Sequence, residues 1–575
     1  MSAKRIVIVG GVAGGASAAA RARRLCEDCE IVVFERGPYV SFANCGLPYF
    51  VGGEIAEQDS LLVQTPQSLK ARFNLDVRVN TEVIAIDRAA RRVKVRELTS
   101  GRESEEPYDA LVLSTGALPL KPPIPGIDRP NHFTVRNIPD VEKIMAWSKD
   151  CQRCRAVVVG GGYIGLEMAE QLQRRGFRVT IVEALPQVMA PLDPEMAAWL
   201  HQEIRANGIA LHLNDPVAAF EDPATWEGEA PAELKPDGSP GGSPSRPPRA
   251  SVVVLKSGAR LPADSVILGL GVKPETKLAR EAGLEIGERG GIRVDEHLQT
   301  SDPDIWAVGD AIEVRDGVTG QWALIPLAGP ANRQGRTAAD NILGRPSRYD
   351  GTWGTAILRL FNLTAGGTGA NGKTLRRLGI PFQTIHLHPN SHAGYYPGAE
   401  PIALKILFAP DTGKLLGAQA VGHEGVDKRI DVLATALKAG LTVHDLAELE
   451  LAYAPPYGSA KDPVNLAGMA AQNVLAGDVA VAQWPEITSL DPKSTVLLDV
   501  RRPDERAKGF IPGSIHIPLD QLRSRIDELP RDREIVVYCH SGQRSYYAAR
   551  ILTQHGFRAR NLTGSYRTWK TAQDL

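Results

Sequence analysis

Two strand–turn–helix units with glycine-rich turns restrict the fold of this 575-residue chain more than any other feature of its sequence. Residues 6–9 and 156–159 are uninterrupted apolar runs, typical of buried parallel strands, and each run leads into a turn that begins with two glycines. A helical segment and a second apolar run, ending in an acidic residue, follow each turn. This repeated order predicts an α/β chain with two Rossmann-like domains, each able to hold a dinucleotide at a helix N-terminus.

The second unit carries the complete glycine fingerprint of a dinucleotide site. Gly160, Gly162 and Gly165 permit a tight turn and a close approach of the pyrophosphate to the helix. Glu183, at the end of the next strand, can accept a hydrogen bond from a ribose 2′-hydroxyl and would repel a 2′-phosphate. This acid favours NADH, although the nearby Arg178 leaves NADPH open as an alternative. The predicted NAD site comprises Gly160, Gly162, Tyr163, Ile164, Gly165 and Glu183.

The first unit departs from the fingerprint, because Val12 takes the place of the middle glycine. Glu35 nevertheless lies where a ribose-binding acid belongs, and residues 114–116 form a further turn of the kind that closes over a dinucleotide. A later apolar segment ends in Gly309 and Asp310, which would place a carboxylate against the ribityl hydroxyls of a flavin. We therefore predict an FAD site formed by Gly10, Val12, Ala13, Gly14, Gly15, Glu35, Arg36, Ser114, Thr115, Gly116, Gly309 and Asp310.

With these motifs, residues 1–474 resemble the pyridine nucleotide-disulfide oxidoreductases, flavoproteins with two dinucleotide sites. Most members carry two redox cysteines in a Cys-x4-Cys arrangement, but this chain has one cysteine there, Cys45, within residues 41–49. That pattern resembles the single-cysteine branch, which contains CoA-disulfide reductases, NADH-dependent persulfide reductases, NADH oxidases and NADH peroxidases. A single thiolate beside a flavin must form either a mixed disulfide with its substrate or a sulfenate.

The resemblance to the CoA-disulfide reductases implies a homodimer in which two tyrosines reach the cysteine of the other subunit. The matching positions are Tyr395 and Tyr453, whose phenols can donate a hydrogen bond or a proton to a thiolate. CoA carries phosphate charges, and Arg21 and Arg24 share one helix face with Ser17; a solvated basic face is the alternative interpretation. The predicted CoA contacts are Ser17, Arg21, Arg24, Ser41, Asn44, Arg72 and Lys461.

Residues 483–575 resemble a rhodanese domain, although Phe510 stands where that family usually has histidine. Cys539 follows an apolar run and opens a glycine-containing loop that leads to Arg544. The backbone N–H groups of such a loop lower the pKa of a thiol and can hold a persulfide anion, and Arg544 would add a positive charge. A phosphatase loop has five residues between its cysteine and arginine, whereas this segment has four. The loop therefore predicts sulfur transfer.

We predict four domains. An FAD-binding domain comprises residues 1–118 and 263–330, and an NAD(P)-binding domain comprises residues 119–262. Residues 222–250 are so rich in proline and glycine that they cannot pack a core, so we interpret them as a flexible insertion, with a linker as the alternative. The remaining domains are an α+β dimerisation domain at residues 331–474 and a C-terminal α/β rhodanese domain at residues 483–575.

Charge and cysteine content limit the partners and location of the chain. Lys and Arg number 66 against 67 Asp and Glu, a net charge of −1, so no global field favours nucleic acid or an anionic membrane. Six cysteines are too few for a disulfide-stapled secreted scaffold, so we expect a soluble cytoplasmic protein without a bound metal. The pairs Cys26/Cys29 and Cys151/Cys154 have spacings that a zinc site or a redox dithiol could use, but we expect cysteines without such a role.

Together these features predict an FAD-dependent, NADH-driven reductase of CoA disulfide, CoA persulfide or polysulfide. CoA would bind as a substrate or as a mixed disulfide on Cys45. Cys539 would carry sulfane sulfur to or from CoA, and fusion would raise the effective concentration of one site at the other. The alternatives are an NADH oxidase or peroxidase that cycles through a Cys45 sulfenate, and a non-catalytic redox sensor.

Overall fold

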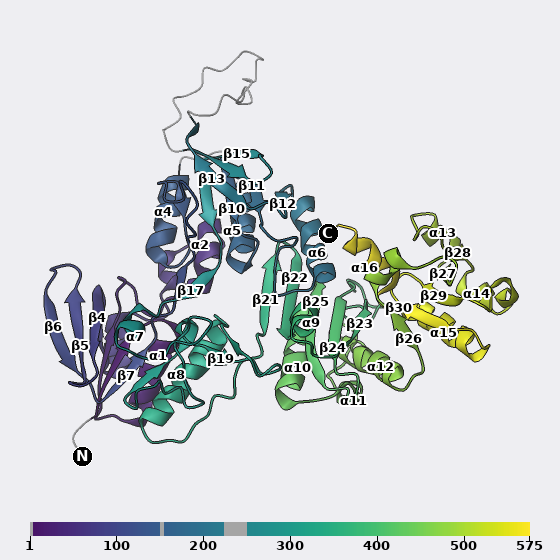
Figure 1. The fold of residues 1–575 in the computed structure, drawn as a ribbon. Helices are drawn as coiled ribbons and strands as arrows, with labels where there is room; N and C mark the ends of the chain where they lie inside the picture. The colour runs from purple at the N-terminus through teal and green to yellow at the C-terminus, as the bar shows by residue number, and fades with distance from the viewer. Residues whose placement is uncertain (1–3, 150–153, 224–249, 575) are drawn as a thin grey trace, which may run out of the picture. The chain divides into compact units, whose positions relative to one another are not determined.

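The structure, a computed structural model, describes residues 4–149, 154–223 and 250–574 (Figure 1). These divide into two compact units. Most of the predicted insertion, residues 224–249, lies outside the described residues. Unit 1 comprises residues 1–185 and 209–352, and unit 2 comprises residues 186–208 and 353–575.

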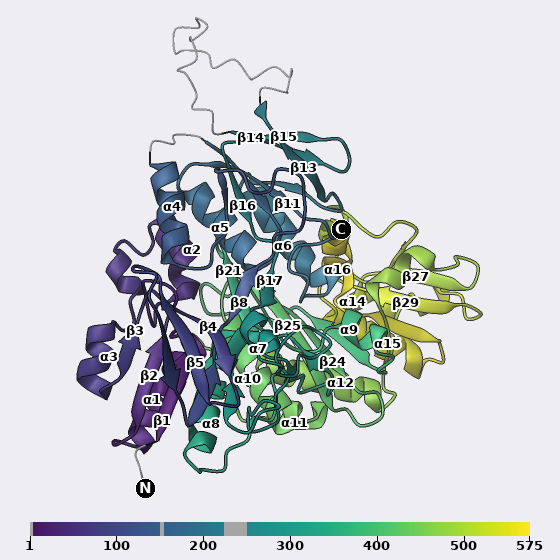
Figure 2. The ribbon, with the colours of Figure 1, turned by 60° about the vertical axis from the view of Figure 1, so that its left-hand side comes forward.

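The first strand–turn–helix motif lies at the centre of a five-stranded parallel sheet in unit 1 (Figure 2). Four of its strands are almost entirely buried, in keeping with their apolar sequences, whereas the edge strand Asp76–Arg78 is half-buried. The helix after the first glycine turn packs closely on a later helix, because a Cβ at Gly335 would lie 2.2 Å from the carbonyl oxygen of Gly14. The order is β18 (Ile305–Ala307), β7 (Ala110–Leu113), β1 (Arg5–Val9), β2 (Glu30–Phe34) and β3 (Asp76–Arg78), and the helices are α1 (Ala13–Leu25) and α8 (Ala328–Ile342).

The second motif forms another five-stranded parallel sheet in unit 1. Two antiparallel three-stranded sheets accompany the parallel ones, β4 (Thr81–Asp87), β5 (Arg92–Glu97) and β6 (Glu103–Pro107), and β13 (Val217–Glu221), β14 (Ser251–Leu255) and β15 (Arg260–Ala263). The parallel order is β12 (Ala210–His212), β11 (Arg178–Val182), β10 (Arg155–Val159), β16 (Ser265–Leu268) and β9 (His132–Phe133), with α5 (Tyr163–Arg174) after the glycine turn.

Unit 2 begins with an antiparallel five-stranded sheet. Helix α6 (Pro194–Ala206) is joined to this sheet by a buried cluster in which the Lys405 ammonium lies 2.7 Å from Asp193 Oδ2 and 2.5 Å from Glu195 Oε1. The sheet order is β21 (Ala356–Leu360), β22 (Leu363–Gly369), β25 (Leu415–Gly422), β24 (Ala403–Phe408) and β23 (Gln383–Leu387), with α9 (Gly372–Arg377), α10 (Val426–Ala439), α11 (Val443–Glu448) and α12 (Pro463–Leu475).

The C-terminal part of unit 2 is a parallel five-stranded sheet with its own helices. It is hydrogen-bonded to β23, because the His386 N–H donates to Thr563 Oγ1 (2.8 Å) and the Gly564 N–H donates to the His386 carbonyl (3.1 Å). The elements are β26 (Ala480–Ala482), β30 (Ala559–Leu562), β29 (Glu534–Tyr538), β27 (Thr495–Asp499) and β28 (Ile515–His516), with α13 (Pro503–Arg506), α14 (Leu519–Leu522), α15 (Gln543–Gln554) and α16 (Ser565–Ala572).

The predicted fold class is confirmed. Unit 1 holds two parallel sheets, and in each of them one strand leads into a glycine turn. Unit 2 holds an α+β domain and a separate α/β domain. No helix in the described ranges has the length and apolarity that a membrane span requires.

Candidate active sites

The first glycine turn forms part of the wall of an 860 Å³ cavity in unit 1. Such a volume suits a bound cofactor. Gly15 packs α1 against β1 instead of lining the cavity, because a Cβ there would lie 1.8 Å from the Gly10 carbonyl oxygen. The other predicted FAD residues all line it: Gly10, Val12, Ala13, Gly14, Glu35, Arg36, Ser114, Thr115, Gly116, Gly309 and Asp310.

The acid at the end of β2 holds the first glycine turn in place. Glu35 accepts hydrogen bonds from the N–H groups of Gly11 (2.9 Å) and Gly37 (2.8 Å). Asp310, in the wall of the cavity, has a pKa raised by burial. The hydroxyl groups of a flavin side chain are suitable donors to these two carboxyl groups, so the residues present fit FAD.

Two cavity residues were not expected from the motifs. Glu275 accepts hydrogen bonds from Arg36 (2.9 Å) and from Arg136 (2.8 Å), and its backbone carbonyl accepts from the Thr115 hydroxyl (2.6 Å). Glu275 therefore fixes two cations and a turn residue in the cavity wall. Arg136 and Glu275 lie outside the glycine motifs, so nothing in the sequence pattern indicated them.

The second glycine turn repeats the geometry of the first. Glu183 accepts from the N–H groups of Gly161 (2.7 Å) and Leu185 (2.8 Å), which are the contacts that Glu35 makes in the first unit. A Cβ at Gly165 would lie 1.9 Å from the Gly160 carbonyl oxygen, whereas a Cβ at Gly162 would meet no described atom within 4 Å. The open space at Gly162 leaves room for a pyrophosphate, so this turn fits NADH.

Cys45 lies beside the FAD cavity, in the short helical turn η1 (Asn44–Gly46) that precedes α2 (Leu47–Gly52). Its side chain is exposed, its N–H donates to Asn44 Oδ1 (3.1 Å), and Asn44 lines the cavity. Partial burial raises the pKa of the Cys45 thiol, and the carboxylates of Glu167 and Asp310 raise it further. The charge of the predicted flavin ligand Asp310 therefore acts on the Cys45 thiol.

Helix α5, which follows the second glycine turn, supplies a second carboxylate near Cys45, and the sequence did not indicate it. Glu167 follows the fingerprint by two residues, and its Oε1 accepts from the Tyr49 hydroxyl (3.4 Å). Burial, together with the Glu167 charge, raises the pKa of Tyr163 to about 12. Glu167 thus connects the NAD turn with the segment that follows Cys45.

The predicted CoA contacts are only partly clustered. Ser17 donates to Asn332 (2.5 Å) and Arg21 is paired with Asp340 (2.7 Å), because α8 packs on this face of α1. The cationic face expected on α1 is therefore reduced to Arg24, which is exposed. Ser41 and Asn44 flank Cys45, Arg72 is exposed in α3 (Pro66–Phe73), and Lys461 is exposed just before α12 in unit 2.

The two predicted catalytic tyrosines lie together in unit 2. Tyr395 follows β23 and Tyr453 follows α11, and their hydroxyl groups are 2.8 Å apart. Both side chains are exposed, Tyr395 at 76% and Tyr453 at 47%. The hydrogen bond to Tyr453 raises the pKa of Tyr395, which keeps this phenol protonated at neutral pH. Two segments distant in sequence thus present a pair of phenols on the surface.

Cys539 lies at the end of β29, and its side chain is fully buried. Its sulfur accepts from the Gly542 N–H (3.1 Å) and from the Ser545 hydroxyl (3.4 Å). Ser565 was missed by the sequence analysis, yet its hydroxyl accepts from the Cys539 N–H (3.1 Å). The loop therefore directs one backbone N–H and one hydroxyl at the sulfur, and such donors can stabilise a thiolate or persulfide anion.

Arg544 is held in place by an acid that the sequence did not indicate. Its guanidinium donates to both carboxylate oxygens of Glu505, at 2.7 and 2.6 Å. The hydrogen bonds from Arg544 lower the pKa of Glu505 to about 2, and those to Glu505 raise the pKa of Arg544. Cys539 also contributes to the raised pKa of Arg544, so Arg544 interacts with both Glu505 and the Cys539 side chain.

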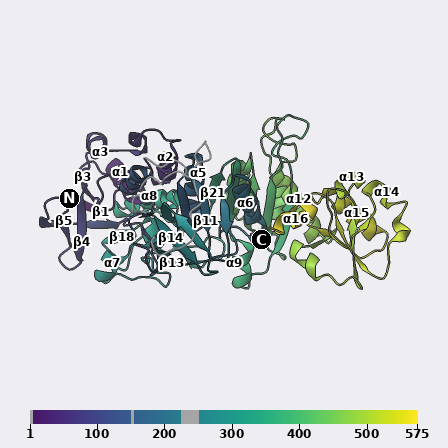
Figure 3. The same ribbon diagram turned by 90° about the horizontal axis from the view of Figure 1, so that it is seen from above.

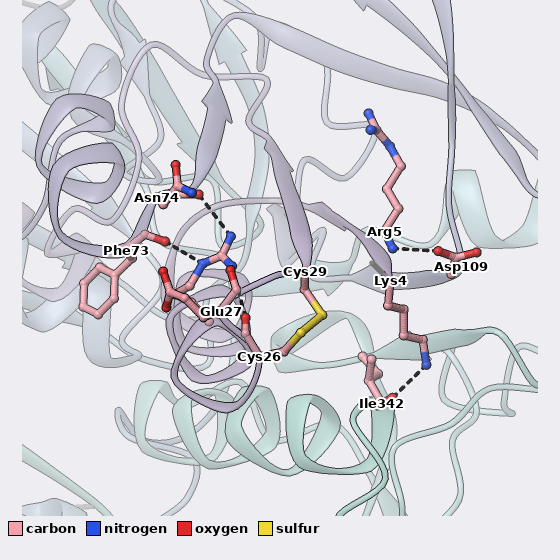
Figure 4. The surroundings of a disulfide bond; sticks show 10 residues. Lys4, Arg5, Cys26, Glu27, Cys29, Phe73, Asn74, Asp109 and Ile342 are labelled. Carbon is pink, nitrogen blue, oxygen red and sulfur yellow. Dashed lines mark hydrogen bonds between the residues drawn. A yellow bond between two sulfur atoms is a disulfide. The ribbon is translucent and has the colours of Figure 1, made fainter. Parts of the chain in front are cut away.

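Cys26 and Cys29 form a disulfide between the end of α1 and β2, with their Cα atoms 5.5 Å apart (Figure 4). The sequence did not predict this bond, which forms because the short connection between α1 and β2 brings both sulfurs together. Bonded sulfurs cannot serve as zinc thiolates. Cys154 is also disulfide-bonded, whereas Cys151 lies outside the described residues. Among the described residues, no three His, Cys, Asp or Glu side chains are grouped as in a metal site.

Comparison with protein families agrees with this geometry. The pyridine nucleotide-disulphide oxidoreductase model matches residues 4–335, and the dimerisation domain of the same family matches residues 356–463. A rhodanese-like domain matches residues 487–572, which contain the Cys539 loop.

Individual proteins similar to the chain carry related names. Coenzyme A disulfide reductase of Staphylococcus haemolyticus is 34% identical over 472 residues, 82% of this chain and 100% of that protein. NADH oxidase of Methanocaldococcus jannaschii is 34% identical over 464 residues, 80% and 97% of the two chains. The crystal structure of reduced Bacillus anthracis CoADR-RHD covers 100% of this chain and 98% of its own, with 48% identity and a TM-score of 0.93.

The structure of a NAD-dependent persulfide reductase from A. fulgidus covers 98% of this chain and 100% of its own, with 38% identity and a TM-score of 0.88. These matches extend over both units, and the family models cover both glycine turns and the Cys539 loop. The chain therefore belongs to the pyridine nucleotide-disulphide oxidoreductases and is an oxidoreductase fused to a rhodanese-like domain.

Proposed function

We propose that the protein reduces CoA disulfide and CoA persulfide with electrons from NADH through Cys45. This proposal is supported mainly by the position of Cys45. Among the described residues the free cysteines are Cys45 and Cys539, and Cys45 lies beside the FAD cavity without a partner cysteine. Such a thiol reacts with an external disulfide, because it has no internal one to close. The names of two similar proteins, a coenzyme A disulfide reductase and a NAD-dependent persulfide reductase, support this substrate class.

The first step is thiol–disulfide exchange at Cys45. The Cys45 thiolate attacks one sulfur of CoA disulfide, a Cys45–CoA disulfide forms, and the other CoA leaves as a thiolate. With CoA persulfide the same mixed disulfide forms and hydrosulfide leaves. FAD, held by the cavity residues around Gly10 and Asp310, would supply the two electrons that come from NADH; with these, the sulfur–sulfur bond of the mixed disulfide breaks, Cys45 returns to its thiolate and the second CoA leaves as a thiolate.

The protein residues position and protonate the sulfur groups. Asn44 holds the Cys45 backbone, and Ser41, Arg24 and Arg72 of unit 1 are available to bind CoA. In a homodimer, Tyr395 and Tyr453 of the partner subunit would donate a proton to the leaving thiolate, a role that suits their exposure. Lys461 would add a cation from the same segment.

Cys539 would exchange sulfane sulfur with CoA. Its thiolate would accept the outer sulfur of a persulfide, and the Gly542 N–H and the Ser545 hydroxyl would hold the resulting persulfide anion. The hydrogen bonds between β23 and the segment that precedes α16 hold this site on the α+β domain, so the two parts are docked and not merely tethered.

The test is NADH turnover by the full chain with CoA disulfide, CoA persulfide, polysulfide and peroxide side by side. Cys45→Ser should lower CoA-disulfide turnover at least about 100-fold, roughly 3 kcal/mol of barrier, while the yellow flavin absorbance remains. Cys539→Ser is the matched control, and it should retain CoA-disulfide reduction but lose sulfur transfer from thiosulfate.

Retention of more than a few per cent of CoA-disulfide turnover by Cys45→Ser would contradict the proposal. If wild-type protein turns over peroxide or oxygen but none of the sulfur substrates, the oxidase activity named for one relative would be the better assignment. In that case Cys45 would cycle through a sulfenate.

A further inference from the structure

Arg567 is a cation beside the Cys539 loop that the proposed mechanism does not use. It lies in the first turn of α16, and its backbone N–H donates to the carbonyl oxygen of His540 (3.0 Å), the residue that follows Cys539. The Tyr566 N–H likewise donates to the Cys539 carbonyl (3.1 Å). The start of α16 is therefore anchored directly to the loop that carries the reactive sulfur.

The Arg567 guanidinium differs from its neighbour Arg544 in having no acidic partner. Arg544 is bound by both oxygens of Glu505, whereas no carboxylate among the described residues lies within ion-pair distance of Arg567. Burial lowers the pKa of Arg567, and the more distant Glu400 only partly opposes this effect. A half-buried cation without a counter-ion is costly, and an anionic ligand would remove that cost.

The surroundings of this guanidinium come from both parts of unit 2. The Arg567 guanidinium stacks on the indole ring of Trp199, with 5.0 Å between the guanidinium carbon and the ring centroid. The same indole ring contacts the imidazole of His388. Trp199 belongs to α6, which Figure 3 shows beside α16. Burial and the Arg567 charge lower the pKa values of His388 and His540, so Arg567 is the positively charged member of the group at neutral pH.

We propose that Arg567, stacked on Trp199, binds the anionic group of the sulfane-sulfur donor that reacts with Cys539. The inference rests on the proposed sulfur transfer and adds the side chains that would select an anionic donor, Arg567 with Trp199 beneath it. The donor site is composite, because α6 lies outside the rhodanese-like domain and supplies the aromatic support.

The chemistry is a balanced transfer of one sulfur atom. With thiosulfate, the Cys539 thiolate attacks the outer sulfur, the Cys539–sulfur bond forms, and the sulfur–sulfur bond breaks with its electron pair leaving on sulfite. With protonated CoA persulfide, the outer sulfur and its proton pass to Cys539 and CoA leaves as a thiolate. Thiosulfate carries its negative charge on the leaving sulfonate, next to the reacting sulfur, whereas CoA carries it on phosphates at the far end of its pantetheine arm, so Arg567 would bind the anionic group of only one of these donors.

The experiment compares donors in the full-length protein, with cyanide as the acceptor. Arg567→Gln should raise the KM for thiosulfate about tenfold, the effect of losing one charge-assisted contact, while kcat changes less than about threefold. Arg567→Lys should be intermediate, because it keeps the charge but not the planar stacking on Trp199. Lys570→Gln, one turn further along α16 and exposed, is the matched control and should leave the KM unchanged.

A neutral organic trisulfide and CoA persulfide complete the comparison. The KM for the trisulfide should be the same in Arg567→Gln and wild-type protein, since no anionic group is recognised. A shift with thiosulfate only, or with CoA persulfide only, supports the inference and identifies the anion. Unchanged KM values for both anionic donors, or an equal shift for the neutral one, would overturn it. Sulfur transfer that is absent in wild-type protein, or unaffected by Cys539→Ser, would instead refute the proposed function.

Discussion

At the scale of single residues, Ser565 is the position where backbone conformation and chemistry are most closely linked. It is fully buried with φ +52°, a left-handed conformation that costs a non-glycine residue of order 1–3 kcal/mol. Its hydroxyl accepts from the Cys539 N–H (3.1 Å) and lies 3.1 Å from the Ser545 hydroxyl. The strained residue is retained where it can hold the backbone of the reactive cysteine.

We predict that Ser565→Ala destabilises the protein more than Ser565→Gly. Both variants lose the hydrogen bond to the Cys539 N–H, which costs about 1–2 kcal/mol in a buried site, but glycine also removes the conformational strain. Urea denaturation of each full-length variant measures the difference. Both should slow sulfur transfer, and equal stability of the two variants would show that the φ value carries no strain.

At the scale of elements, helices α13 and α15 are joined by the ion pair between Glu505 and Arg544. Hydrogen bonds from Arg544 lower the pKa of Glu505 to about 2. A carboxyl group whose pKa falls on folding stabilises the folded state above its unfolded pKa. That contribution disappears as the pH falls toward the folded pKa. The link between these helices should therefore weaken between about pH 5 and pH 2.

We predict that Glu505→Gln lowers the free energy of unfolding by about 1 kcal/mol at neutral pH, a value discounted for solvent screening. As the pH falls toward 2, the difference between the variant and the wild type should shrink, because Glu505 is already protonated in the unfolded state and becomes protonated in the folded state as well. Unfolding in urea across this pH range is the measurement. Glu528→Gln, which removes an exposed pair with Arg525, is the control and should change little at any pH. An equal loss at all pH values would rule out the ion pair as the cause.

At the scale of the whole molecule, the buried cluster around Lys405 connects the parts of unit 2. Lys405 contacts Asp193 and Glu195, and Glu195 Oε1 also lies 2.9 Å from His386 Nε2. Burial alone would raise the pKa of Glu195, but Lys405 and His386 lower it well below its usual range. The backbone of His386 in turn bonds Thr563 and Gly564, so the cluster reaches the rhodanese-like domain.

We predict that Lys405→Met destabilises unit 2 by about 3–5 kcal/mol, because it leaves two buried carboxylates without a counter-charge. Differential scanning calorimetry should show the α+β and rhodanese-like parts melting together at a lower temperature. Lys414→Met, at an exposed position that precedes β25, is the matched control. A shift confined to one of two separate transitions would show that the docked parts are not thermodynamically coupled.

The site residues that the sequence could predict are those whose positions depend on residues close to them in the chain. The turns at Gly10 and Gly160, the acids Glu35 and Glu183, and the Cys539 loop each lie within one strand–turn–helix segment, and the structure places them as expected. Arg21 was expected to be a free cation, but Asp340 pairs with it from a helix more than 300 residues later in the chain. Periodicity on one helix cannot reveal which helix will pack against it.

The sequence by itself determined the two glycine turns, the single cysteine in the motif around Cys45 and the separate loop after Cys539, because short-range sterics and strand–helix periodicity specify these features locally. Only the tertiary structure decided how distant groups meet: Tyr395 with Tyr453, Glu505 with Arg544, Ser565 with Cys539, and Trp199 with Arg567. These contacts depend on how sheets and helices pack, and packing is a property of the whole chain that no local pattern encodes.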